Sequence, residues 1–274
     1  MKYELHCHSV HSHGKKLYWE APMKPEQIIK ALKRKGFTGA AITDHDSVKA
    51  WPEAKRAAKK HGMVFIPSME VSTAGGHLLA HGISEKIRSG MTVEETVDAV
   101  HDQGGIAVAP HPFDLKGEGM GMNFTKCDAA EVFNSLNLSR LENRIARNAI
   151  ENSGVPAVVG SDAHCFGMLG RSVNHIDAQD MDAALKMIKK GAVRFETSYV
   201  PVPVVVSWAR ERMRLSYDGI LEYMEKNYSP PKRRFAKFML DRFVSSRSPL
   251  WDGLGYFSIG VSVLYSYLRM VTGI

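Results

Sequence analysis

Short apolar runs alternate with helix-like segments over most of the chain, and this alternation constrains the fold more than any other feature. The runs GAAIT, MVFIPSM, IAVAP and PAVVG are punctuated by Gly or Pro, and segments such as PEQIIKALKRKG and TVEETVDAVHDQGG repeat apolar residues every three to four positions. This pattern predicts buried parallel strands with helices between them, in a sheet that is open or closed. With 274 residues, 44% of them apolar, the chain can form one large core plus an appendage.

Residue types that bind metal ions follow five of the strand-like runs. They are His6 and His8 after YEL, Asp44, His45 and Asp46 after GAAIT, Glu70 after MVFIPSM, His111 after IAVAP, and Asp162 and His164 after PAVVG. Parallel α/β sheets place ligands outside the C-terminal ends of their strands. The two imidazoles of a His-x-His pair point to one side, because side chains alternate along a strand. The recurrence predicts a metal centre, whereas a single histidine would be expected to be a core or rim residue.

The motifs HCHS, ITDHDS, SMEVS, GHLLAHG, APHPF and GSDAH, in this order, resemble those of the polymerase and histidinol phosphatase (PHP) family. The resemblance covers roughly residues 1–197. It implies a distorted (β/α)7 barrel, a cluster of up to three divalent ions and phosphoester hydrolysis.

The resemblance also implies a set of ligands for each ion. The first site would use His6, His8, Glu70 and Asp162, with Glu70 bridging to a second site of Glu70, His77 and His111. The third site would use His45, His164 and His13, which stands in SHG where the family commonly has the Asp of SDG. His11 is the alternative to His13. His81 competes with His77, but the two lie about 13 Å apart along a strand, too far to bind one ion, and the family pattern favours His77.

The predicted ligand set is poor in negative charge. Glu70 and Asp162 are its only carboxylates, so three divalent ions would leave about four positive charges for hydroxide, water and substrate to offset. The third site is therefore in doubt. A set rich in imidazole favours zinc or iron over magnesium, and the family also tolerates manganese. We expect two or three divalent ions.

The expected chemistry is attack of a metal-activated water on a phosphate ester, with Asp162 and His164 as catalytic residues at the centre. Arg171 is a candidate phosphate anchor, because a guanidinium suits oxyanions, although a solvated arginine is the alternative. The expected substrate is a small phosphorylated metabolite, a nucleotide or an oligonucleotide end. Two alternatives stay open: amidohydrolase-like cleavage of a C–N bond, and a non-catalytic barrel, stabilised by metal, that binds nucleic acid.

The chain divides near residue 200. Residues 1–200 are the predicted barrel, and residues 201–274 are a basic, mainly helical extension with eleven Lys or Arg against six Asp or Glu. We expect the extension to pack on the barrel or to form an oligomer contact. The alternative is attachment to a membrane surface or a nucleic acid. Three scattered cysteines and the absence of a signal-like start favour the cytoplasm.

Overall fold

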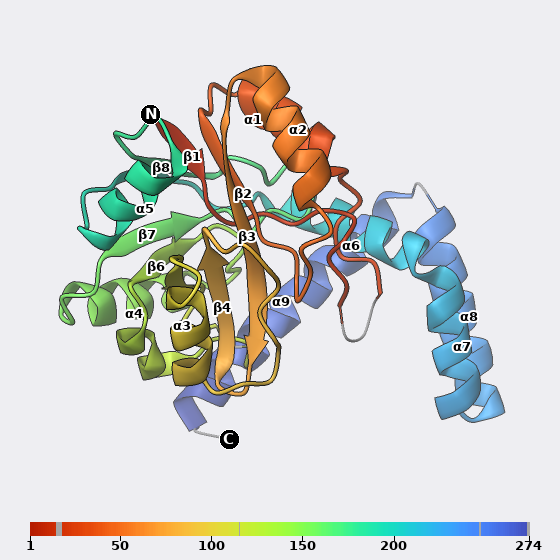
Figure 1. The fold of residues 1–274 in the computed structure, drawn as a ribbon. Coiled ribbons are helices and arrows are strands. Elements are labelled where there is room, and N and C mark those ends of the chain that lie inside the picture. The colour runs from red at the N-terminus through yellow and green to blue at the C-terminus, as the bar shows by residue number, and fades with distance from the viewer. Residues whose placement is uncertain (15–17, 115, 247, 273–274) are drawn as a thin grey trace.

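The computed structural model describes residues 1–14, 18–114, 116–246 and 248–272. Within these residues one sheet of nine strands has the order β7-β6-β5-β4-β3-β2-β1-β8-β9. The strands are β1 (Lys2–Glu4), β2 (Gly39–Ile42), β3 (Val64–Thr73), β4 (Gly76–His81), β5 (Ile106–Ala109), β6 (Ala129–Asn134), β7 (Ala157–Gly160), β8 (Ser172–His175) and β9 (Arg194–Thr197). Figure 1 shows how the sheet curls around a central core.

Contacts between β7, β1 and β8 nearly close the sheet into a barrel. Just beyond the end of β1, Cys7 pairs in parallel with Ala163, which follows β7. The side chain of Asn174 in β8 bonds to both backbone groups of Val159 in β7, at 3.0 and 2.8 Å. The predicted distorted (β/α)7 barrel with a helical C-terminal extension is therefore confirmed.

The sheet is mixed, which differs from the parallel sheet that the alternation predicts. Strands β1, β2 and β3 are parallel neighbours, as are β5, β6 and β7. Strand β4 is antiparallel to both β3 and β5, and β8 is antiparallel to both β1 and β9. The cause at β4 is the short Ala74–Gly75 connection, because a parallel crossover needs a dozen or more residues.

Helices with one buried face cover the sheet. They are α1 (Pro25–Arg34), α2 (Trp51–His61), α3 (Val93–His101), α4 (Arg140–Glu151) and α5 (Met181–Lys189), with a 3₁₀ helix, η1 (Gly121–Lys126), before β6. Helix α3 begins with a capping box, in which Thr92 and Glu95 bond to each other's backbone N–H. These helices bury the outer face of the barrel and leave the C-terminal strand ends to the loops.

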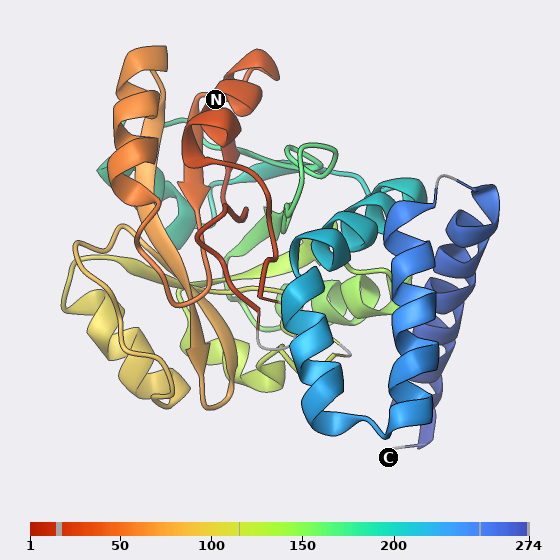
Figure 2. The same ribbon diagram turned by 90° about the vertical axis from the view of Figure 1, so that its right-hand side faces the viewer.

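Four further helices form the C-terminal extension. They are α6 (Val202–Leu215), α7 (Tyr217–Asn227), α8 (Pro230–Ser245) and α9 (Pro249–Thr272). Figure 2 shows them together on one side of the barrel, with α6 next to it. In the described residues, none of the helices is both long and apolar enough to span a bilayer. The partners expected for this extension stay predictions.

Candidate metal centre

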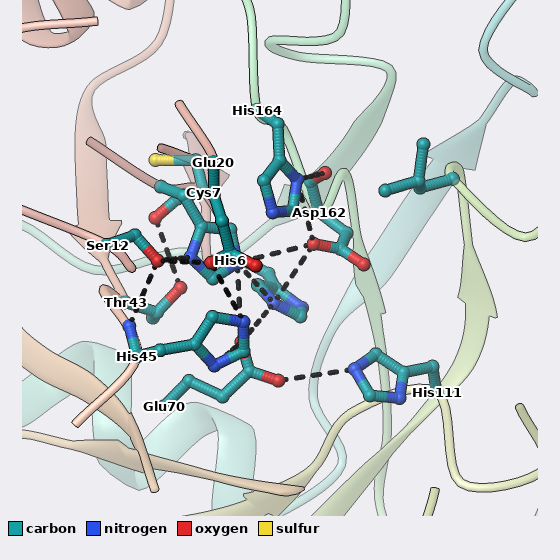
Figure 3. A network of polar contacts seen from close by, with 12 residues as sticks. His6, Cys7, Ser12, Glu20, Thr43, His45, Glu70, His111, Asp162 and His164 are labelled. Atoms are coloured by element: carbon teal, nitrogen blue, oxygen red, sulfur yellow. Dashed lines mark hydrogen bonds and ion pairs between the residues drawn. The ribbon is translucent and has the colours of Figure 1, made fainter. Parts of the chain in front are cut away.

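Eight of the nine predicted metal ligands lie together at one end of the barrel. They are His6, His8, His45, Glu70, His77, His111, Asp162 and His164, and several are drawn in Figure 3. Their ligand atoms form four overlapping groups, in each of which all atoms lie within 4.8 Å of one another. The side chains come from six segments of the chain, most of them at the end of a strand, so the fold itself brings them to one place.

Glu70 of β3 lies at the middle of this cluster and is almost fully buried. Its Oε2 atom is 3.2 Å from His6 Nε2 and 3.3 Å from His8 Nε2. Its Oε1 atom is 3.0 Å from His77 Nδ1 and 3.2 Å from His111 Nε2. Oε2 also lies 3.5 Å from His45 Nδ1. The two oxygens thus face different sets of imidazoles, which is the arrangement that a carboxylate bridging two cations requires.

Asp162 completes the first group of ligands. Its Oδ1 atom is 3.3 Å from His8 Nε2 and 3.5 Å from His6 Nε2. Asp162 has a φ of 48°, and His111 has a φ of 29°. Non-glycine residues rarely adopt this left-handed conformation, and it is maintained mainly at functional sites. Here it lets the chain turn sharply after the strand while the side chain stays at the centre.

Hydrogen bonds fix the tautomers of His6 and His164. His6 Nδ1 donates to Glu131 Oε1 at 2.8 Å, and His164 Nδ1 donates to the carbonyl oxygen of Asp162 at 2.9 Å. A neutral imidazole that donates through Nδ1 keeps a lone pair on Nε2, the atom that would bind a metal. Both residues are therefore held in the form that a metal ligand needs.

The donor atoms fit divalent cations. His6 Nε2 and His8 Nε2 face each other at 3.3 Å, although a nitrogen with a lone pair cannot donate to another. The Nδ1 atom of His77 lies 3.0 Å from Glu70 Oε1 but is buried without a partner in hydrogen-bond geometry. Cations among these atoms would satisfy both features, and imidazole with carboxylate suits zinc, iron or manganese. The cluster can hold metal ions. Its donor atoms do not specify which metal binds or how many ions bind.

Glu131 is a member of the site that sequence reasoning missed. Besides holding His6, its carboxylate accepts from the backbone N–H of His111 at 3.0 Å and from Asn134 Nδ2 at 2.9 Å. A carboxylate that orients a metal-binding histidine is a common arrangement around metal ions. The signal was a single acidic residue inside the otherwise apolar run AAEVF, which would be costly to bury without a partner.

His13 is the predicted ligand that the structure does not group with the other eight, and its role as a ligand stays a prediction. Its ring stacks on Tyr18 at 4.1 Å between centroids and meets the edge of Trp19 at 5.8 Å. Neither His13 nor His11 belongs to the ligand groups found among the described residues. Glu20 is likewise in none of these groups, but its Oε2 atom lies 3.6 Å from His45 Nε2.

His77 and His81 point to different partners. His77 faces Glu70, whereas His81 Nδ1 lies 2.8 Å from the hydroxyl of Ser68. Burial, with a smaller effect of the charge of His6, lowers the pKa of His81 to about 3. His81 is therefore a neutral, buried residue beneath the cluster.

Arg171 lies in the loop after the cluster. Its Nε donates to the carbonyl oxygen of Gly167 at 3.1 Å. Burial and the charge of Arg171 together lower the pKa of Lys35, which caps the end of α1. Within the described residues no contact joins Arg171 to the cluster. Its role as a phosphate anchor stays a prediction.

Carboxylates and imidazoles in the cluster shift each other's pKa. Burial would raise the pKa of Glu70, but the charges of His45, His6 and His77 and a hydrogen bond from His111 hold it well below its usual value. Burial would lower the pKa of His8, but Asp162 and Glu70 raise it to about 10. Burial would also lower the pKa of His111, but the hydrogen bond and the charge of Glu70 raise it to about 9. Without cations, His8 and His111 are therefore protonated at neutral pH.

Metal binding is therefore expected to release protons and to strengthen as the pH rises from about 6 to about 9. The direction follows because the raised pKa values keep His8 and His111 protonated in the metal-free protein, so a cation must displace their protons. Titration calorimetry in buffers of different ionisation enthalpy would measure both effects. An affinity that does not change with pH, with no proton release, would contradict this expectation.

Comparisons with known proteins agree with this geometry. The PHP domain family matches residues 4–137, and a family described as PHP-associated matches residues 140–193. An uncharacterized protein of Methanocaldococcus jannaschii is 32% identical over 157 residues, which are 55% of this chain and 91% of that protein. A 5′-3′ exoribonuclease of Haemophilus influenzae is 35% identical over 72 residues, 26% of this chain and 24% of that protein.

Two solved structures share the fold at low sequence identity. One is a two-domain protein from Bacteroides vulgatus containing a predicted PHP-like metal-dependent phosphoesterase, with a TM-score of 0.60 and 14% identity. That match covers 72% of this chain and 64% of the other, so this chain spans just under two thirds of it. The other is PsfC from Pseudomonas syringae, with a TM-score of 0.53 and 15% identity over 78% of this chain and 98% of PsfC. With its motifs, its barrel and its cluster of histidines and carboxylates, this chain belongs to the PHP domain family.

Proposed function

We propose that this protein hydrolyses phosphoester bonds, with water as the nucleophile, at a centre of two or three divalent ions. The observation that carries the proposal is Glu70, whose two oxygens face separate sets of imidazoles at 3.0 to 3.5 Å. When bound, paired divalent ions lower the pKa of water and offset charge on the attacking and leaving oxygens of a phosphate. The chain supplies the frame that sets their spacing.

Individual residues of the chain have separate tasks in this scheme. Glu70 and Asp162 supply the negative charge that draws cations into a buried site. Glu131 keeps a proton on His6 Nδ1, and the carbonyl of Asp162 keeps one on His164 Nδ1, so both imidazoles present lone pairs. Rings fixed in this way do not need to reorganise when charge develops on the phosphate, which lowers the barrier.

The residues beside the histidines are poor nucleophiles. The thiol of Cys7 donates to the carbonyl of Ala41 at 3.3 Å, and burial together with the charges of Glu4 and Asp44 raises its pKa well above its usual value. The hydroxyl of Ser9 donates to Asp44 at 2.6 Å. Water is therefore the nucleophile that the proposal requires.

The proposed substrate is a small phosphorylated metabolite, a nucleotide or the end of an oligonucleotide. A cationic cluster selects for a phosphate group but does not by itself identify what the phosphate is attached to. The relative named as a 5′-3′ exoribonuclease supports the inclusion of oligonucleotide ends, although this chain matches only 24% of it.

Assays with matched chromogenic substrates would test the reaction type. We expect the metal-loaded protein to hydrolyse p-nitrophenyl phosphate or bis-p-nitrophenyl phosphate, and to leave p-nitroacetanilide intact. Dialysis against a chelator should abolish the activity, and zinc, manganese or iron should restore it. His61→Gln, at the outer end of α2, is a control that should keep the wild-type rate. Cleavage of the anilide alone would instead favour an amidohydrolase. If phosphoesters are hydrolysed, a screen of phosphorylated metabolites and oligonucleotides would then identify the substrate.

A further inference from the structure

We propose that Glu20 is the acidic ligand of the third metal position, and that helix α6 of the C-terminal extension holds Glu20 and His164 in place for it. This inference rests on the metal centre proposed above, but metal binding can test it independently of catalysis. It gives the extension a role in the site, where the sequence predicted only packing or attachment to partners.

The third position is defined by His8, His45 and His164, whose ring nitrogens form one of the ligand groups. The rings of His45 and His164 lie 4.9 and 4.3 Å from that of His8. None of the three residues carries a negative charge. Glu20 supplies one, because its Oε2 atom is 3.6 Å from His45 Nε2 and its side chain is only 12% exposed.

The charge balance of the centre favours this ligand. With Glu70 and Asp162 alone, three divalent ions would leave about four positive charges, and Glu20 reduces this excess to about three. Ser12 donates its hydroxyl to Glu20 Oε2 at 3.0 Å, which fixes the same oxygen that faces His45. Glu20 therefore compensates for the acid that the family commonly has at the position of His13.

Helix α6 ties down the short segment that carries Glu20. The indole of Trp208 donates to the backbone carbonyl of Glu20 at 2.7 Å. Arg212 donates to Glu20 Oε1 at 3.3 Å and to the carbonyl of Trp19 at 3.0 Å. The hydroxyl of Ser216, which caps the end of α6, accepts from the backbone N–H of Trp19 at 3.3 Å. Arg212 occupies Oε1 and leaves Oε2 for the third position.

The same helix also contacts a histidine of the cluster. The ring of Trp208 lies 5.0 Å from that of His164. The guanidinium group of Arg212 lies over the ring of Trp208, 5.1 Å from its centroid. One indole thus lies beside the ring of His164 and donates its N–H to the backbone of Glu20. Trp208 is a positioning residue, because it acts on the third position through these two neighbours.

The number and affinity of bound ions in the full-length protein would test the assignment of Glu20. Metal-free protein would be titrated with manganese and with zinc, and bound metal counted by mass spectrometry after equilibrium dialysis. Glu20→Gln should weaken the weakest-bound ion by about 100-fold or more, because it removes a charged ligand while keeping the shape of the side chain. The matched variant His13→Gln should bind all ions as the wild type does.

Three outcomes would overturn the assignment of Glu20. They are a wild-type protein that binds only two ions at every concentration, a loss of the third ion in His13→Gln but not in Glu20→Gln, and unchanged binding in Glu20→Gln. Failure of the proposed function would look different, because three ions would then bind without any phosphoester hydrolysis.

Variants of α6 would test its positioning role. Trp208→Ala should weaken the third ion by about 10- to 100-fold and leave the two tighter ions unchanged. Trp208→Phe should recover part of this loss, because it keeps the ring beside His164 and loses only the bond to Glu20. Arg214→Ala is the control on the same helix, since the side-chain contacts described for Arg214 are with Glu211 and the carbonyl oxygen of Val244, away from the site residues. Wild-type affinity in Trp208→Ala, or equal weakening of all three ions, would overturn the role of α6.

Discussion

Replacing Glu70 with glutamine is expected to reduce phosphoester hydrolysis by about 1,000-fold or more, because stabilisation of several kcal/mol is lost with the bridging charge. The substitution keeps the size of the side chain but removes the negative charge that faces His6, His8, His45, His77 and His111 at 3.0 to 3.5 Å. The buried site would then have one negative charge fewer to offset the cations that it would hold. The rate constant and the metal content would be measured on the same preparation.

Glu85→Gln provides the matched control for Glu70→Gln. Glu85 lies on the surface in the loop after β4, outside the cluster. The Glu85→Gln variant should therefore keep both the wild-type rate and the wild-type metal content. If Glu70→Gln stayed within a few-fold of the wild type in activity and in metal content, a bridging role for Glu70 would be excluded.

A second large effect is expected from Gly160→Ala, at the end of β7. A methyl group there would overlap with Oε1 of Glu131 and would lie 2.5 Å from its carboxyl carbon. Glu131 has little freedom to move, because its oxygens bond to His6 and to the backbone of His111. Overpacking of this kind typically costs about 1–3 kcal/mol of stability. Displacement of Glu131 should also lower metal affinity by about 10- to 100-fold through the loss of its bond to His6.

Chemical unfolding and metal titration would measure the two consequences of Gly160→Ala. The control is Gly219→Ala in α7, where an added methyl group meets nothing within 4 Å. That change should be neutral or slightly stabilising, because alanine favours a helix over glycine by about 1 kcal/mol. If both variants behaved alike, the carboxylate of Glu131 would not be as tightly held as its contacts indicate.

The convergence of the ligands could be predicted from sequence because it depends on a repeated local rule. The parallel strands of the barrel point to the same end, so His6, Glu70, His111 and Asp162 meet there although they are far apart in the chain. The reversed direction of β4 escaped this rule. It depends on the short connection after Thr73, and strand periodicity is the same in both directions.

Glu20 and Glu131 could not be assigned from sequence, for two different reasons. The position of Glu20 depends on contacts with Trp208 and Arg212, which lie 188 and 192 positions further along the chain. No local pattern carries that information. Glu131 is part of an apolar strand, and its partner His6 belongs to another strand. The family pattern places His13 among the ligands, but its stacking on Tyr18 depends on the folded loop and could not be predicted from sequence.

Anomalous diffraction from crystals grown with manganese or zinc would test the central claim most directly. We expect separate peaks in two places, one among His6, His8, Glu70 and Asp162, and one among Glu70, His77 and His111. Maps recorded at the absorption edge of the metal that show no peak at either place, from crystals of protein that hydrolyses phosphoesters, would contradict the claim that this cluster is the catalytic metal centre.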